Sequence, residues 1–203
     1  ICRVSSFNYG FYPNESAMVI SELDRRGVHD EAERRLEVFT NYQGTAVMAG
    51  KYSTKDGVFY GAGGYECGQY GQHHGWSLWV LAEHYRYSHD KEWLTKAAPN
   101  MIKGCDWVIK ERRATMKADD KGIRVIEYGF LPPGGLEDVT EFWHWVVTNV
   151  HAYRGLKSAA EVLSEIKHPE AERLKEEAES YREDLLTGIM EAMIRGPVVK
   201  LND

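Results

Sequence analysis

The sequence lacks the features that mark several large classes of protein. It has only three cysteines, Cys2, Cys67 and Cys105, and none stands in a Cys-x-x-Cys or His–Cys spacing. A zinc site is therefore not indicated, and at most one disulfide could form. Basic residues form no run, and a net charge of −6 with a pI near 5.8 argues against a nucleic-acid partner. Charge of this size does not exclude a neutral ligand.

Long apolar runs are also missing. None approaches the length of a membrane span, so we expect no membrane partner, and no signal peptide opens the chain. Ile1 is not an initiator methionine, so we expect a processed N-terminus or a piece of a longer chain, and the compartment stays open.

Three catalytic or cofactor-binding patterns are absent as well. The chain has no Gly-rich phosphate loop followed by Lys and Ser/Thr, no Gly-x-Ser-x-Gly and no His-x-x-x-His pair. These absences argue against a P-loop nucleotide site, an α/β-type serine hydrolase and a helical metal pair. We therefore expect no cofactor and no metal.

What the chain does have is an ordinary globular composition. Its 203 residues are 43% hydrophobic and 28% charged, which allows one domain with a sizeable core or two small ones. Aromatic residues make up 12% of the chain, and we expect most of these rings to serve the core.

Hydrophobic periodicity predicts an all-α chain of three helical hairpins, at about residues 14–43, 73–115 and 139–195. In the first hairpin, Asn14 can cap a helix that Gly27 ends. In the other two, the first helix is apolar nearly all round, which is typical of an element buried on several sides. The second helix of each hairpin is amphipathic.

The links between hairpins are long, whereas the turns within them are short. An open superhelix such as a tetratricopeptide array has short links and a regular period, but here the links carry tens of residues. We therefore expect a single domain of closed-ring type, with apolar helices inside, amphipathic helices outside and the long loops at one mouth. Within the second link, a β-branched run at residues 123–126 is consistent with a short strand.

The most informative stretch is residues 128–156, a Pro-Pro-Gly-Gly loop followed by an apolar helix. It brings three carboxylates beside three rings, namely Glu137, Asp138, Glu141, Trp143, His144 and Trp145. Acids that transfer protons, next to flat rings that cover the apolar faces of a pyranose, are what a sugar-cleaving site needs. The alternative is that acidic residues in a first helical turn only complement the helix dipole.

Three short segments carry a resemblance to a known family. Residues 12–17 read Tyr-Pro-Asn-Glu-Ser-Ala, residues 72–78 read Gln-His-His-Gly-Trp-Ser-Leu, and residues 136–139 read Leu-Glu-Asp-Val. In that order they resemble the Trp-x-Arg-Asp-Ser-Ala, Gln-Arg-Asp-Gly-x-x-Leu and Trp-Glu-Glu-Val segments of the six-hairpin (α/α)6-barrel glycosidases, most closely the glucoamylase-like and related bacterial α-glycosidases. Residues 154–160 resemble the same family's small-residue helix continuation.

The resemblance implies a glycoside hydrolase built on an (α/α)6 toroid. Glu137 takes the position of the family's general acid. The positions of two Arg-Asp pairs, the first of which holds the sugar, are taken by Asn14-Glu15 and His73-His74. Because both pairs differ from Arg-Asp, we expect sugar recognition to differ. The predicted sugar-binding residues are Asn14, Glu15, His73 and His74. The family's catalytic base comes from a later inner-helix loop, so further chain segments or a second copy would complete the ring.

The residues themselves suggest further roles. Glu66 lies in a glycine-rich segment that lets the backbone approach a ligand, and it is the in-chain candidate for a second carboxylate. Asp138 and Glu141 are alternates for the acid, and each of the three could equally be an ordinary loop or helix-start residue. Three tryptophans are candidates for stacking on sugars, although burial with a satisfied N–H is commoner: Trp76, Trp143 and Trp145.

Together these patterns predict an inverting glycoside hydrolase that acts on α-linked glucosides or related oligosaccharides. Three rivals stay open: a non-catalytic carbohydrate-binding module, a helical-repeat protein-interaction module, and an unrelated toroid enzyme such as a lyase. A shared site requires the starts of the three apolar helices to converge.

Overall fold

The computed structural model describes residues 12–59, 70–137 and 139–196. The elements in these residues are α1 (Pro13–Arg25), α2 (His29–Asn41), α3 (His73–Ser88), α4 (Lys91–Arg113), β1 (Gly134–Leu136), β2 (Val139–Trp143), α5 (Val146–Glu165) and α6 (Ala171–Arg195). The mostly helical class that the sequence predicted is confirmed. None of the described helices is both long and apolar enough to cross a membrane.

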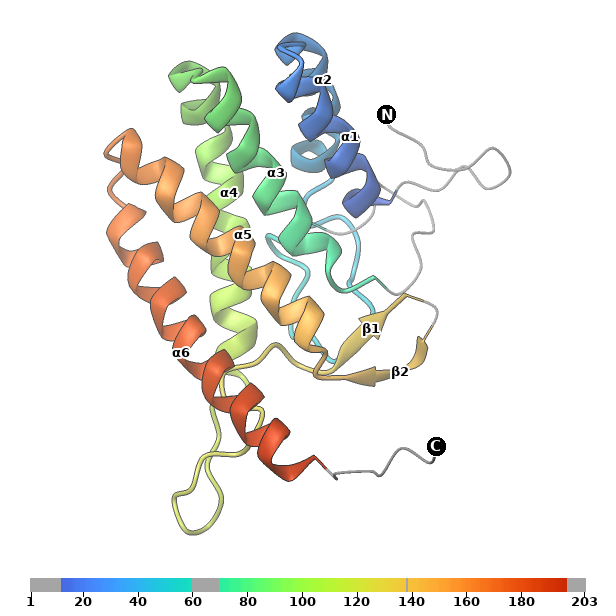
Figure 1. Cartoon of the computed structure of the whole chain (residues 1–203), viewed down its shortest axis with the longest axis vertical. Coiled ribbons are helices and arrows are strands. Elements are labelled where there is room, and N and C mark those ends of the chain that lie inside the picture. Colours follow the sequence, from blue (N-terminus) through green and yellow to red (C-terminus); the bar gives the residue numbers. More distant parts are fainter. Residues whose placement is uncertain (1–11, 60–69, 138, 197–203) are drawn as a thin grey trace, which may run out of the picture.

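Consecutive helices pair into hairpins with short turns. α1 packs against α2, α3 against α4 and α5 against α6, and α3 also contacts both α1 and α5 (Figure 1). The second helices fill the gaps behind this row, because α2 also contacts α3 and α4 also contacts α5. The helices of each hairpin run in opposite directions, so the long links gather at the end where α1, α3 and α5 begin. The β1–β2 hairpin lies at that end (Figure 1).

α3 is buried on nearly all sides. Leu78, Leu81 and Ala82 are fully covered, and even Trp79 is only 8% exposed. Its neighbour α4 begins with a side-chain cap, since Asp90 accepts a hydrogen bond of 2.9 Å from the N–H of Trp93. The apolar residues nearly all round α3 therefore mark it as the helix at the centre of the core.

Two glycines let α3 and α5 approach each other closely. A Cβ built on Gly75 would lie 2.2 Å from the carbonyl carbon of His151, and one on Gly155 would lie 2.7 Å from Cβ of Leu78. Side chains at these positions would separate the helices. The crossing fixes the start of α5 beside the start of α3, which is what places the candidate site.

The prediction that the third hairpin begins with a helix at residue 139 is wrong. Val139–Trp143 is β2, which pairs antiparallel with β1, and the helix starts only at Val146. The β-branched and aromatic residues of this segment favour a strand, and Trp145 anchors it by donating a hydrogen bond of 2.9 Å to the carbonyl of Gly134. Glu141 therefore sits on a strand, so the helix dipole does not explain it.

Two smaller predictions also fail. Asn14 is not a cap, because Pro13 already occupies the first helical position and Tyr12 precedes the helix without a side-chain cap. Residues 123–126 contain no strand beyond one isolated bridge between Ala118 and Arg124. There Asp119 Oδ1 accepts hydrogen bonds from the N–H groups of Lys121 and Ile123, which holds a turn.

Candidate functional site

The starts of α1, α3 and α5 lie at one end of the molecule, with the β1–β2 turn beside them (Figure 1). Four polar residues stand at this end. Glu15 is in the first turn of α1, Gln72 directly precedes α3, Thr148 is in the first turn of α5, and Glu137 forms the β1–β2 turn. Segments far apart in the sequence therefore contribute to one site.

Short contacts hold this end together. Gln72 Nε2 donates a hydrogen bond of 3.4 Å to Glu137 Oε1. The N–H of Gly71 donates one of 3.0 Å to the carbonyl of Gly135. A Cβ on Gly71 would lie 3.2 Å from Cγ2 of Thr148, so the chain entering α3 touches both the β-hairpin and α5.

Glu137 has a backbone conformation that is common in tight turns but unusual for a glutamate. Its φ is +50°, in the left-handed region that residues other than glycine, asparagine and aspartate seldom adopt. The side chain is exposed and accepts a hydrogen bond from Gln72. The strained turn thus projects a carboxylate over the start of α3.

Glu15 is the site residue whose ionisation is altered. Its pKa is raised by burial, lowered by a hydrogen bond from its backbone, and raised again by the charge of Glu137. The two carboxylates are thus close enough to interact, although they come from α1 and from the β1–β2 turn. Two carboxyl groups in one site, one of them with a raised pKa, are the arrangement that acid–base chemistry uses.

Several oxygen atoms at this end are buried and have no hydrogen-bond partner among the described residues. They are Asn14 Oδ1, Glu15 Oε2, Gln72 Oε1 and Thr148 Oγ1. Buried polar atoms in folded proteins are nearly always satisfied, so a group of orphans at one place indicates a ligand or ordered water. The two amide oxygens can only accept hydrogen bonds, and the carboxyl and hydroxyl oxygens of Glu15 and Thr148 can also accept them, so a ligand with hydroxyl or amine donors would match the group.

The two histidines of the predicted sugar-binding pair are both fully buried. His74 accepts a hydrogen bond of 2.9 Å at Nδ1 from the N–H of Phe59, and its Nε2 lies 3.0 Å from the carbonyl of Gly104. Both ring nitrogens are thus used by the backbone, and His74 leaves the set of ligand-binding candidates. His73 stacks on Tyr70, with ring centroids 4.8 Å apart. Burial lowers the pKa of each histidine to about 3.

The three tryptophans have different surroundings. Trp76 is half-buried on α3 and stacks on His151, with centroids 4.8 Å apart, so one face of its ring is occupied. The indole N–H of Trp145 is used by the carbonyl of Gly134. Trp143 is 60% exposed and lines a hollow of about 270 Å³ with Phe130, near the end of α6. None of these positions, in the described part of the chain, places a free ring face against Glu15.

The other predicted carboxylates do not join the pair. Glu141 is exposed on β2. Asp138 and Glu66 lie outside the described residues.

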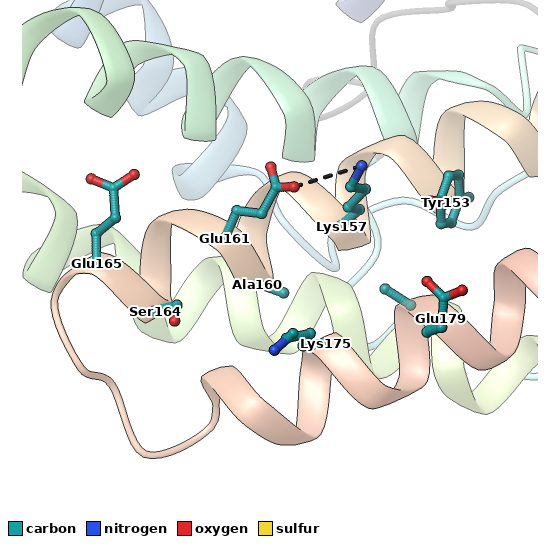
Figure 2. Close-up of a pocket in the computed structure, with 9 residues that line it drawn as sticks. Tyr153, Lys157, Ala160, Glu161, Ser164, Glu165, Lys175 and Glu179 are labelled. Atoms are coloured by element: carbon teal, nitrogen blue, oxygen red, sulfur yellow. Dashed lines mark ion pairs between the residues drawn. The ribbon is translucent and has the colours of Figure 1, made fainter.

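A larger groove in the described part of the chain lies elsewhere. Figure 2 shows this space of about 430 Å³ between α5 and α6, where Lys157 on α5 pairs with Glu161 at 3.7 Å, opposite Lys175 and Glu179 on α6. It contains none of the predicted site residues. Its charged, open rim indicates the outer surface of a hairpin and not the site at the helix starts.

Sequence reasoning had no signal for Thr148, and it noted Gln72 only as part of a segment. Both are uncharged residues beside helix starts, and their common feature is a buried, unpartnered oxygen that only the folded chain reveals. No protein-family model, curated protein or solved structure matches the chain, so the site itself has to carry the functional argument.

Proposed function

We propose that the chain is a glycoside hydrolase domain of the (α/α)6-toroid type, acting on α-linked glucosides or related oligosaccharides. The observation that supports this is the nearness of Glu15 and Glu137 where three packed helices begin, together with buried oxygen acceptors on residues at the same helix starts. Glycoside hydrolysis requires two carboxyl groups, one to protonate the leaving oxygen and one to act on the other face of the sugar. The hydroxyl groups of a sugar are donors that the orphan acceptors would bind.

The raised pKa favours Glu15, and not Glu137, as the general acid. A carboxyl group whose pKa is raised stays protonated closer to neutral pH, which is what proton donation to a leaving group needs. Glu137, exposed in its turn and contacted by Gln72, then serves as the carboxylate that activates water. Asn14, Gln72 and Thr148 bind hydroxyl groups in this proposal.

The ring is part of the same proposal. α1, α3 and α5 correspond to three inner helices and α2, α4 and α6 to their outer partners, so three more hairpins are needed, from further chain segments or a second copy. Exposed apolar side chains along the free edge of α5 and α6 support such packing, since Val146 is 46%, Val150 43% and Met190 61% exposed.

The test is hydrolysis of a panel of α-glucosides, including maltose, isomaltose and an aryl α-glucoside. Glu15→Gln and Glu137→Gln should each lower turnover by about 10²–10⁴-fold while maltose binding in calorimetry survives. Inversion requires that NMR detect β-glucose as the first product. Glu141→Gln, which changes an exposed carboxylate on β2, is the matched control and should retain activity.

Wild-type turnover in both Glu15→Gln and Glu137→Gln would reject the pair as catalytic. Sugar binding without any turnover by the wild type would favour the carbohydrate-binding module. An unsaturated, ultraviolet-absorbing product from an acidic polysaccharide would favour the lyase. If the wild type neither binds nor hydrolyses any of these sugars, the protein-interaction module is favoured.

A further inference from the structure

Three side chains that commonly bind metals meet at the opposite end of the helices. Asp24 lies near the end of α1, His29 is the first residue of α2, and His84 lies in the second half of α3. His29 Nδ1 is 2.9 Å from Asp24 Oδ1, and His84 Nδ1 is 2.9 Å from Oδ1 and 3.1 Å from Oδ2. One ligand atom from each residue lies within 4.8 Å of the other two.

The carboxylate of Asp24 is fully buried. Its side chain is 0% exposed, and its ion-pair partners among the described residues are His29 and His84, whose side chains are 35% and 2% exposed. A buried carboxylate is costly unless it is hydrogen-bonded or paired with a positive charge, and an imidazole supplies positive charge only when protonated. The described residues thus place no permanent cation on this carboxylate.

The geometry is close to that of a divalent metal site. Two imidazoles and one carboxylate are a common set of three protein ligands for Zn²⁺, with a fourth position for water. Tetrahedral ligands around zinc stand about 3.3 Å apart, so each imidazole nitrogen would move away from the carboxylate oxygen by about 0.4 Å. The three ligand atoms, which all lie within 4.8 Å of one another, would also have to close around the shared ion. Trp93 packs on His84, with centroids 4.3 Å apart, and the partly exposed His29 opens the site to solvent.

We propose that Asp24, His29 and His84 bind a zinc ion that ties the α1–α2 turn to α3. The sequence patterns did not indicate a metal because the three ligands come from three elements and form no local spacing. The ion supplies the charge that the buried carboxylate lacks, and it fixes the end of the first hairpin opposite the start of α1. This proposal is independent of any hydrolase activity.

Zinc binding is measured on the whole chain after treatment with a chelator. Titration with zinc chloride should give one site with a Kd below about 10 µM, and saturating zinc should raise the melting temperature by roughly 5 °C. Cobalt chloride should give the visible d–d absorption of a four-coordinate site. No zinc-dependent rise in melting temperature, or no binding in the titration, would overturn the proposal.

Two variants separate this site from incidental binding. His29→Gln changes a partly exposed ligand, so the chain should still fold, and zinc should bind at least about tenfold more weakly. His89→Asn is the matched control, because it replaces an exposed histidine after α3 with a residue that tolerates the same left-handed backbone, and it should bind zinc as the wild type does. Wild-type affinity in His29→Gln, or loss of affinity in His89→Asn, would reject these ligands.

Discussion

Glu15 in the first turn of α1 and Glu137 in the β1–β2 turn interact electrostatically, although more than half of the chain separates them in the sequence. Burial first raises the pKa of Glu15, and the charge of Glu137 adds to the rise. The relationship exists because α3 packs against both α1 and α5, which brings the β-hairpin before α5 to the start of α1.

Glu137→Gln should lower the pKa of Glu15. The substitution removes the charge that disfavours ionisation of Glu15 but leaves burial in place, so the pKa should fall and still stay above its ordinary value. Titration of the side-chain carboxyl carbon by NMR, assigned with Glu15→Gln, measures this shift. Glu141→Gln should leave the pKa of Glu15 unchanged, and equal effects of both substitutions would show that the two carboxylates are not coupled.

The hairpins could be predicted from the sequence because their signals are local. Gly27 follows the first helix, Asp90 caps α4, and the apolar residues nearly all round α3 mark a helix that is buried on several sides. The structure places these helices within a few residues of their predicted bounds, except that α5 begins at Val146 and not at residue 139.

The region between β1 and α5 could not be predicted in the same way. Its hairpin depends on a positive φ at Glu137 and on the hydrogen bond from Trp145 to Gly134, neither of which leaves a periodic pattern. The partners of the site, Gln72 and Thr148, meet only through the α3–α5 crossing. Resemblance indicated Glu15 and Glu137 separately, but the coupling between them is a property of the fold.

His73 and His74 should make the protein sensitive to acid. Burial lowers both pKa values to about 3, whereas an unfolded histidine has a pKa near 6.5. The unfolded state binds protons first as the pH falls, so stability is complete above about pH 6.5 and is lost between there and about pH 3. The loss should approach 1.4 kcal/mol per pH unit for each histidine within that window.

Denaturant unfolding at pH 7, 6, 5 and 4 measures this slope. His74→Phe removes one of the two buried imidazoles, so its unfolding free energy should fall less steeply with pH than that of the wild type, even though its stability at pH 7 is lower. An unchanged slope in His74→Phe would show that the imidazole is protonated in the folded protein.

Gly75→Ala should destabilise the α3–α5 crossing by about 3 kcal/mol or more, because its Cβ would lie 2.2 Å from a backbone carbon that cannot move independently of α5. The matched control is Gly196→Ala, where the nearest atoms lie at 3.4 Å and the unfolding free energy should change by less than about 0.5 kcal/mol. Urea unfolding measures both. A small change in Gly75→Ala would mean that the two helices can separate without loss.

Arg112→Ala should destabilise the fold by about 3 kcal/mol, because it removes a buried cation and leaves two largely covered carboxylates without their main partner. Arg112 is fully buried at the end of α4, 2.5 Å from a carboxylate oxygen of Asp184 and 3.2 Å from one of Glu177, both on α6. Arg113→Ala is the matched control, since its guanidinium is 59% exposed and pairs with the same Glu177, and its cost should stay below about 1 kcal/mol. Chemical unfolding of the two variants at pH 7 measures the difference. Equal costs would show that burial adds nothing to the pairing, and the attachment of α6 to α4 would then depend on apolar packing alone.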